Sequence, residues 1–529
     1  MSVVLSESQR RKSTGTYYTS NAVAQFLVSA IAISPLDRVL EPCFGEGVFI
    51  DAWRRRTVGQ GQLVGCDIAG DVVQNGRARY PETDLRHVDF FDVRPGSFGT
   101  FTAVVGNPPF VRYQRFQGDL REKALNCAQS AGVCLTSLSS AWVPFLIHAA
   151  QQLHVGGRMA VVAPMEITYA KYARPFLQFL GKNFGSIRIV SFNEPLFPDL
   201  SESTVLLLAK DWGRRSTGID LIHANTLDEL QAEEIWFHPA RHVQLGQWEN
   251  EGTRSQRFRI SREAEDLYET VSRMVPTLDD LARLTIGYVT GNNTWFHLDR
   301  QAVVQRDLQD DVRLVVRRHA DLGSVGLAIN LDDLERWAGH GAHWLFVPRE
   351  PLSPAARRYV AEGEEQGIPN AYKCRVRAPW WKVPGVASHD FMVGVLSSSG
   401  PRVIGSMIPA TNSLLVGTLK TNVDVRILAA ASITSLSSLS AEIVGHALGG
   451  GALKLEPSEA RRWSLPVNQA PDEAALLAID DHLRLGRHDE AVGIANDVFL
   501  KRGLGLSAHD VNILDEALLT LRRQRTKSP

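Results

Sequence analysis

The stretch Gly106-Asn107-Pro108-Pro109-Phe110 constrains the fold more than any other part of the chain. It follows the apolar run 101–105, which is typical of a buried strand. Two consecutive prolines can neither continue a strand ladder nor enter a helix interior, so the backbone must leave the sheet in a fixed extended shape. An amide side chain, two proline carbonyls and an aromatic ring are thereby held at the carboxyl end of a strand, where open α/β sheets bind their ligands. We interpret this loop as a binding site for the exocyclic amine of a flat ring.

Strand-like apolar runs alternate with helical stretches through the first part of the chain. A helix is expected at 21–33, capped by Ser20. Seven strands are expected, at 38–41, 63–67, 85–89, 101–105, 158–164, 187–192 and 204–209. This alternation predicts an α/β fold with a seven-stranded, mainly parallel, Rossmann-like sheet that helices cover on both faces.

Gly45 and Gly47 follow the first expected strand, at a strand-to-helix turn. Glycines there let the backbone approach a ligand, and the following helix offers free N–H groups. A lone Gly-x-Gly is more often a plain tight turn, but Asp67 ends the next strand 20 residues after Gly47. An acid at that spacing accepts hydrogen bonds from ribose hydroxyls in nucleotide-binding folds. Because the third glycine of a dinucleotide fingerprint is missing, we expect an adenosine-type ligand rather than NAD.

Asp89 and Phe90 stand at the end of the third expected strand. The acid could accept a hydrogen bond from an adenine amine while the ring lies against the adenine face. A surface acid beside a core phenylalanine explains the pair equally well, because short motifs often match by chance.

The composition bounds the class of protein. At 529 residues, with 44% hydrophobic and 22% charged residues, the chain can form two or three globular cores. The net charge of -1 neither favours nor excludes a nucleic-acid partner, which needs only a local basic face. The five cysteines contain no Cys-x-x-Cys pair and no zinc spacing with histidine, so we expect reduced thiols, a cytoplasmic location and no metal site. The polar, partly basic stretch 1–14 is not expected to be a signal peptide, and the sequence has no apolar run of about 18 residues, so no membrane partner is expected.

The order of these motifs resembles that of the DNA adenine-N6 methyltransferases of the γ arrangement, the TaqI-like group of restriction-modification systems. The resemblance is close over residues 14–210 and looser beyond them. It implies S-adenosylmethionine as the cofactor, a catalytic loop at 107–110, and stacking of the target base by Phe110 and Phe197. The cofactor-binding residues that it implies are Thr16, Tyr17, Thr19, Glu41, Pro42, Gly45, Gly47, Asp67, Ile68, Asp89, Phe90 and Asn107.

The chemistry expected from this resemblance centres on the poor nucleophilicity of an adenine amine. If the Asn107 side-chain oxygen and the Pro108 carbonyl accept its hydrogens, the nitrogen can direct its lone pair at the methyl group. The base must first leave the duplex, and stacking on an aromatic ring, worth about 1–3 kcal/mol per base, would offset that cost. The family usually has tyrosine where this chain has Phe110, but stacking needs only the ring. Cys43 follows a proline, as does the nucleophile of cytosine-C5 methylation, yet it lies at the cofactor end, so we interpret it as a packing residue.

The second half of the chain is interpreted through the same resemblance. We expect a catalytic domain at 1–213, a connector at 214–285, a mixed α/β target-recognition domain at 286–467 and a helical tail at 468–529. No separate core for a fused nuclease is evident. Basic and aromatic residues expected to contact DNA are Arg112, Tyr113, Arg115, Arg317, Arg318, Arg375, Arg377 and Lys382. Trp380 and Trp381 are expected in the core rather than on DNA.

The leading hypothesis is a sequence-specific methyltransferase that modifies adenine N6 in double-stranded DNA. We expect a monomer whose functional partner is a separate restriction endonuclease. Asn-Pro-Pro-aromatic also occurs in enzymes that methylate RNA or protein glutamine, so these remain alternatives. A non-catalytic DNA-recognition subunit is a further alternative, but it would not need Gly45, Asp67 and Asn107 together.

Overall fold

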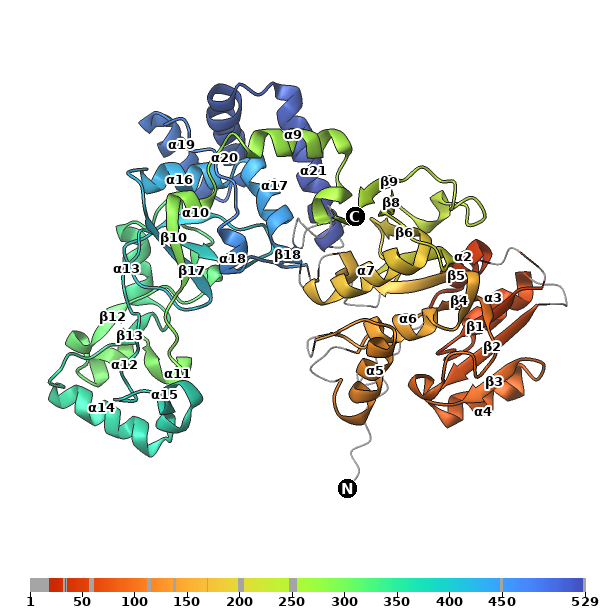
Figure 1. Ribbon diagram of the computed structural model, residues 1–529. Coiled ribbons are helices and arrows are strands. Elements are labelled where there is room, and N and C mark those ends of the chain that lie inside the picture. The colour runs from red at the N-terminus through yellow and green to blue at the C-terminus, as the bar shows by residue number, and fades with distance from the viewer. Residues whose placement is uncertain are drawn as a thin grey trace. The chain divides into compact units, whose positions relative to one another are not determined.

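The computed structural model describes residues 19–31, 34, 36–56, 61–111, 116–136, 139–168, 170–197, 204–246, 255–447 and 451–526. The chain forms two compact units, Met1–Arg259 and Ile260–Thr526 (Figure 1). The boundary between them falls inside the segment 214–285, which the sequence suggested as a connector.

Unit 1 is built on one nine-stranded sheet. Its strands, in spatial order, are β3 (Asp84–His87), β2 (Gln62–Asp67), β1 (Arg38–Glu41), β4 (Phe101–Gly106), β5 (Leu153–Pro164), β7 (Thr204–Trp212), β6 (Phe184–Phe192), β8 (Gly218–Ala224) and β9 (Arg241–Gln244). The first five pair in parallel, β7 runs antiparallel to both neighbours, and β8 pairs in parallel with β6 and antiparallel with β9. The mainly parallel α/β fold is therefore confirmed, with two strands more than the seven expected.

Strands β8 and β9 escaped the sequence analysis because polar residues interrupt their apolar pattern. Asp220 of β8 lies 3.3 Å from the guanidinium of Arg188 on β6. Arg188 is 8% exposed and also donates to the carbonyl oxygens of Ile235 and His238. An ion pair between neighbouring strands cannot be inferred from periodicity, since Asp220 alone looks like part of a surface loop.

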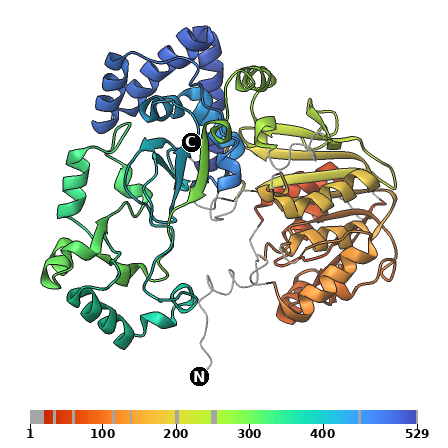
Figure 2. The ribbon, with the colours of Figure 1, turned by 60° about the vertical axis from the view of Figure 1, so that its left-hand side comes forward.

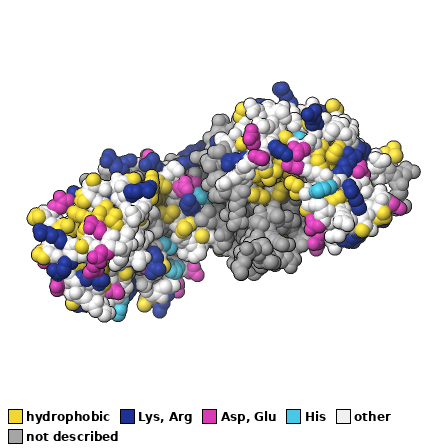
Figure 3. Space-filling model, turned by 90° about the horizontal axis from the view of Figure 1, so that it is seen from below, with side chains coloured by type: hydrophobic (Ala, Val, Ile, Leu, Met, Phe, Trp, Pro, Cys, Tyr) yellow, Lys and Arg dark blue, Asp and Glu magenta, His cyan; other side chains and the backbone are white. Residues whose placement is uncertain are grey.

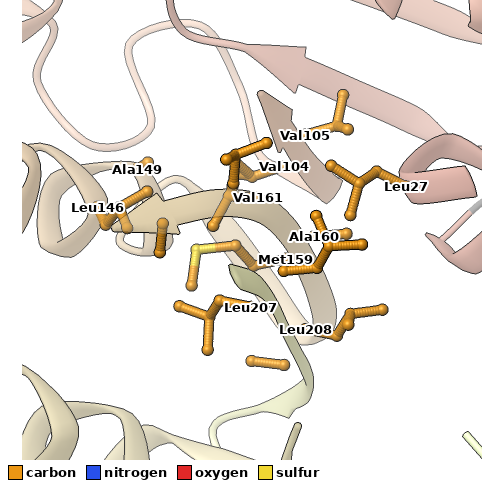
Figure 4. Packing of buried hydrophobic residues seen from close by; sticks show 14 of the residues in the cluster. Leu27, Val104, Val105, Leu146, Ala149, Met159, Ala160, Val161, Leu207 and Leu208 are labelled. Carbon is orange, nitrogen blue, oxygen red and sulfur yellow. The ribbon is translucent and has the colours of Figure 1, made fainter. Parts of the chain in front are cut away.

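Six helices of the described chain pack in unit 1, on both sides of the sheet (Figure 2). They are α2 (Asn21–Ile31), α3 (Val48–Arg56), α4 (Gly70–Arg79), α5 (Gly118–Ser130), α6 (Trp142–Ala150) and α7 (Arg174–Asn183). Figure 4 shows Leu27 of α2 and Leu146 of α6, each beside buried side chains from the strands β4, β5 and β7. Ser20 caps α2, since its hydroxyl accepts from the amide of Val23 at 3.3 Å. This core fixes the strand ends that carry the candidate site.

Unit 2 contains three small sheets, and all their strand pairs are antiparallel. The first has the order β10 (Ala282–Ile286), β17 (Leu414–Leu419), β14 (Phe391–Gly394), β16 (Val403–Gly405). The second has the order β11 (His297–Leu298), β13 (Trp344–Phe346), β12 (Val312–Leu314), and the third β15 (Leu396–Ser397), β19 (Leu453–Lys454), β18 (His446–Ala447).

Helices surround these sheets. They are α9 (Arg262–Ser272), α10 (Leu278–Leu281), α11 (Asn293–Phe296), α12 (Arg300–Gln305), α13 (Leu331–Gly339), α14 (Pro354–Glu365), α15 (Tyr372–Arg375), α16 (Val425–Ser432), α17 (Ser435–Val444), α18 (Pro457–Ala460), α19 (Glu473–Arg484), α20 (His488–Ala495) and α21 (Ala508–Thr526). The segment suggested as a tail supplies α19 to α21, which pack into the unit's apolar clusters. Arg525 of α21 and Glu442 of α17 form a buried ion pair at 2.7 Å. These last helices are therefore part of the unit's core.

Within the described residues, no single helix is both long and apolar enough to cross a membrane, and the bent pair α16 and α17 qualifies by length and composition only. The same residues contain no group of three or more His, Cys, Asp or Glu side chains placed to hold a metal ion.

Candidate functional site

Four predicted site residues lie at one edge of the unit 1 sheet. Glu41 ends β1, Asp67 ends β2, Asn107 directly follows β4, and Asp89 follows β3. Because these strands are parallel neighbours, their carboxyl ends meet at the same edge. Side chains that are far apart in the sequence are thereby assembled along a single line.

The glycine loop after β1 has a backbone that other residues would not readily adopt. Gly45 and Gly47 have φ values of +50° and +81°, in the left-handed region. A Cβ atom on Gly47 would also lie 2.6 Å from the ring of Tyr80. The amide of Gly45 points at β2, and it donates to Oδ2 of Asp67 at 3.0 Å, while the amide of Ala69 donates to Oδ1 at 2.9 Å. Two backbone groups thus orient the Asp67 carboxylate.

Glu41 is a buried carboxyl group. It is 1% exposed, and neither of its carboxyl oxygens has a hydrogen-bond partner among the described residues. Burial raises the pKa of Glu41 well above its usual value, and the nearby charge of Asp67 raises it further. Burying a carboxyl group without hydrogen-bond partners raises the free energy of the ligand-free protein. The presence of Glu41 therefore favours a ligand that brings a positive charge.

The Asn107 loop is connected to both the N-terminal segment and the glycine loop. The side-chain nitrogen of Asn107 donates to the hydroxyl of Thr19 at 3.2 Å. The thiol of Cys43 donates to the carbonyl oxygen of Asn107 at 3.2 Å. Burial, followed by the charge of Glu41, raises the pKa of Cys43, so the thiol stays protonated and inert as a nucleophile. These contacts support the interpretation of Cys43 as a packing residue.

The predicted aromatic residues are all largely buried. Phe110 is 6% and Phe197 7% exposed, and both belong to the main core cluster of unit 1. Phe90 is 4% exposed, with its ring centroid 5.0 Å from that of Phe145 and 4.8 Å from that of His148. The surroundings of Phe90 are thus those of the core alternative that the sequence left open.

Asp89 and Ile68 lie at the same sheet edge as Glu41 and Asp67. Asp89 accepts from the amide of Phe91 at 3.1 Å and lies 3.4 Å from the ammonium group of Lys123. Ile68 is 62% exposed beside Asp67, so its side chain is accessible to a ligand at this edge. Lys123 carried no sequence signal, because it lies on α5 and meets Asp89 only in the folded chain. Thr16, Tyr17, Arg112, Tyr113 and Arg115 lie outside the described residues.

A second polar group follows β5. The hydroxyl of Tyr172 donates to Glu166, and the indole nitrogen of Trp142 donates to the same hydroxyl at 3.3 Å. Burial and the adjacent Glu166 raise the pKa of Tyr172. The phenol therefore stays protonated and holds the short helix 165–168 in place.

The predicted DNA-binding residues of unit 2 differ in their contacts. Arg375 is exposed on α15, whereas Arg377 donates to the carbonyl oxygens of Val289 and Thr290. Arg318 lies 3.6 Å from Asp321, and Lys382 lies 3.2 Å from Glu350. Figure 3 likewise shows Lys and Arg side chains interspersed with Asp and Glu on the face that it draws.

The tryptophan pair of unit 2 lies in its apolar core. Trp381 is 8% exposed, and the partly buried Trp380 has its ring centroid 4.9 Å from that of Trp295. The core interpretation of both residues is confirmed.

Two protein families match successive parts of the chain. Residues 67–197 match the Eco57I restriction-modification methylases, and residues 253–500 match the C-terminal domain of the type II methyltransferase M.Eco57I. The chain belongs to the restriction-modification methyltransferase family. The first match spans Asp67 to Phe197 and so includes the Asn107 loop, while the second covers most of unit 2.

Individual relatives of this family are distant. The chain is 23% identical over 229 residues to the type II methyltransferases M.HincII and M.HindII of Haemophilus influenzae. Each alignment covers 43% of this chain, with 43% of M.HincII and 42% of M.HindII, so it spans less than half of either relative. Among solved structures, the type IIG restriction endonuclease BpuSI is similar with a TM-score of 0.47 and 15% identity, over 97% of this chain and 66% of that one.

Proposed function

We propose that this chain transfers a methyl group from S-adenosylmethionine to the exocyclic N6 amine of adenine in double-stranded DNA. One juxtaposition carries the proposal: the buried Glu41 carboxyl group and the Asn107-Pro108-Pro109-Phe110 loop share one sheet edge. The thiol of Cys43, two residues after Glu41, reaches the backbone of Asn107 at 3.2 Å. The Glu41 carboxyl group, which would favour a cation, and the Asn107 loop, which would accept hydrogen bonds from an amine, therefore lie next to each other.

The donor set at this edge fits S-adenosylmethionine. Glu41 lacks a partner among the described residues, and the α-ammonium group of the cofactor would provide one. Asp67 keeps acceptor capacity for ribose hydroxyls, because each of its carboxylate oxygens accepts one backbone hydrogen bond and has room for another. Ile68 would cover an apolar part of the nucleoside. Asp89 would accept from the adenine amine.

The chain's own residues would then position the target. When bound, S-adenosylmethionine supplies a methyl group already activated by a sulfonium. The Asn107 side-chain oxygen and the Pro108 carbonyl would accept the two hydrogens of the adenine amine, which draws its lone pair out of ring conjugation. Thr19 holds the other end of the Asn107 amide at 3.2 Å, so the amide keeps one orientation. Positioning and electrostatics supply most of the rate enhancement in such a site.

The target adenine must leave the DNA stack to reach this edge. Phe110 would stack on one face of the base, and Phe197 would close the other. Each contact would offset about 1–3 kcal/mol of the cost of extrusion. Both rings are preordered by the core, so little side-chain entropy is lost when the base enters.

The experiment combines purified protein with labelled S-adenosylmethionine and, separately, double-stranded DNA, RNA or a protein extract. We expect label in DNA, and sequencing should locate it as N6-methyladenine within one short recognition sequence. Label confined to RNA or to protein glutamine would refute the proposed substrate. Label in cytosine would refute the proposed chemistry.

We further propose that this modification protects DNA from a separate restriction endonuclease. Plasmid DNA from cells that express the chain should resist an endonuclease that cuts the modified sequence. Plasmid from cells that express the Asn107→Ala variant is the matched control and should be cut. Equal cleavage of both plasmids by every enzyme that cuts at the modified sequence would refute the protective role.

A further inference from the structure

A chain of polar side chains joins the carboxyl ends of β6 and β8. Ser191 and His223 are register partners on these parallel strands, and the Ser191 hydroxyl lies 3.0 Å from Nδ1 of His223. Nε2 of His223 lies 3.0 Å from Oδ1 of Asn193, and Nδ2 of Asn193 donates to Oδ1 of Asn225 at 2.7 Å. We call these four residues the β6–β8 polar chain.

As the structure places the atoms, the β6–β8 polar chain has a consistent set of donors and acceptors, and the Ser191 hydroxyl also lies 3.4 Å from the carbonyl oxygen of Ile222. Oδ1 of Asn193 can only accept, so Nε2 of His223 carries the hydrogen. In a neutral imidazole the other nitrogen then accepts, and the Ser191 hydroxyl donates to it. The ring keeps an exposed edge, but loss of water around it and the charge of Arg259 lower the pKa of His223 to about 4. At neutral pH the ring is therefore uncharged.

Backbone hydrogen bonds also join the residues after β6 to the end of β8. The amide of Asn193 donates to the carbonyl of Ala224 at 3.1 Å, and the amide of Glu194 donates to that of Asn225 at 3.0 Å. Glu194 and Pro195 themselves are exposed. Hydrogen bonds to β8 therefore hold the start of the segment 193–197, whereas its end, Leu196 and Phe197, packs against the core of unit 1.

The segment held in this way ends at Phe197. We propose that the β6–β8 polar chain positions Phe197 for stacking on the extruded adenine, and that His223 is a positioning residue. The inference rests on the proposed function, in which Phe197 contacts the base. The inference gives β8 a role in the reaction, because β8 fixes the direction in which the segment 193–197 leaves the sheet. Pro195 then restricts the backbone of this segment before Phe197.

The test compares His223→Leu, which removes both ring hydrogen bonds, with His223→Gln, which keeps a donor toward Asn193. The matched control is His242→Leu. His242 lies on the outermost strand β9 and pairs with Asp220 of β8 at 2.9 Å, so it is a β8-bound histidine outside the β6–β8 polar chain. Amide hydrogen exchange of the segment 193–197 in the ligand-free protein should accelerate in His223→Leu. It should stay near the wild-type rate in His223→Gln and His242→Leu.

The functional measurement uses DNA with 2-aminopurine at the target position. In His223→Leu we expect a smaller fluorescence rise on binding and roughly tenfold lower kcat, with KM for S-adenosylmethionine within about twofold. Adding Phe197→Ala to His223→Leu should lower kcat no further than Phe197→Ala alone, because both changes remove the same stacking contact.

Three results would overturn the inference. They are unchanged exchange of 193–197 in His223→Leu, a kcat and fluorescence response equal to those of His242→Leu, or single effects that multiply in the double variant. Failure of the proposed function looks different, since the wild-type protein would then transfer no methyl group to DNA. The exchange measurement would still decide whether the β6–β8 polar chain holds the segment.

Discussion

Glu41 in unit 1 and Arg377 in unit 2 are both ionisable groups shielded from solvent, yet their surroundings differ. Glu41 has no hydrogen-bond partner among the described residues, whereas Arg377 donates to the carbonyl oxygens of Val289 and Thr290. A half-buried charge whose hydrogen bonds go to the backbone serves the fold. One without partners raises the free energy of the empty protein and favours a ligand that completes it. The comparison separates a candidate binding site from a structural joint.

The same contrast applies to the backbone around each group. At the strand edge of unit 1, Gly45 and Gly47 adopt left-handed φ values that shape the loop beside Glu41. In unit 2, Arg377 stabilises the loop that contains Val289 and Thr290 by binding its carbonyls. The first loop takes its shape from two glycines, and the second is held by an arginine side chain.

The largest expected effect concerns the loop beside Glu41. Asn107→Ala removes the side-chain oxygen that would accept from the adenine amine. We expect kcat to fall by about 10²–10³-fold or more, the range for removing one such hydrogen-bonding group from a preorganised site. Cofactor affinity, measured by calorimetry, should stay within a few-fold. The rate is measured as label transferred to DNA in a single turnover.

Cys43→Ala is the matched control for Asn107→Ala, since the Cys43 thiol donates to the backbone carbonyl of Asn107 and not to its side chain. Transfer should remain within a few-fold of wild type, because the thiol is a donor and not a nucleophile. Near-normal turnover of Asn107→Ala, or complete inactivity of Cys43→Ala, would reverse the two roles.

The second effect tests Glu41 directly. Glu41→Gln keeps the shape of the side chain but removes the charge that a ligand ammonium would meet. Cofactor affinity should fall about 100-fold, in the range of a lost buried charge pair. The ligand-free protein should become more stable at neutral pH, because burying a carboxylate costs more than burying an amide. The exposed Glu46 of the same loop supplies the control Glu46→Gln, which should change neither property.

The raised pKa of Glu41 also predicts the pH dependence of binding. In the free protein the carboxyl group holds its proton above the usual range, whereas a bound cation would favour the carboxylate. Binding therefore releases a proton, and affinity should fall as the pH drops below the raised pKa, by at most tenfold per pH unit. Calorimetry in buffers of different ionisation enthalpy measures the released proton. A wild-type profile as flat as that of Glu41→Gln would contradict the assignment.

The stability of the ligand-free protein should follow the opposite trend. A carboxyl group whose pKa is raised by folding contributes its stability below the ordinary pKa and loses it as the pH rises through the raised one. Wild type should therefore lose thermal stability relative to Glu41→Gln on going from pH 5 to pH 8. An unchanged difference between the two melting temperatures would show that Glu41 does not titrate in this interval.

The sequence predicted what the backbone alone determines. Consecutive prolines after an apolar run located the Asn107 loop, and the glycine spacing located Asp67, because strand ends in a parallel sheet have a fixed geometry. It could not reveal β8, whose Asp220 pairs with Arg188 across the sheet. It also could not separate Arg375 from Arg377, since only tertiary contacts decide which guanidinium is exposed.

That last distinction gives the smallest expected effect. Arg377→Met removes the guanidinium donors from the carbonyls of Val289 and Thr290, of which Thr290 keeps, among the described residues, only the weak bond from the Cys374 thiol, and should lower the stability of the protein by about 1–3 kcal/mol. Arg375→Met removes an exposed charge and should leave stability within about 0.5 kcal/mol. If Arg375 contacts a phosphate, its loss should weaken DNA binding and reduce the slope of log affinity against log salt by about one. Chemical denaturation and salt-dependent DNA binding measure the two properties separately. A large loss of stability in Arg375→Met, with none in Arg377→Met, would contradict the division between structural and exposed arginines.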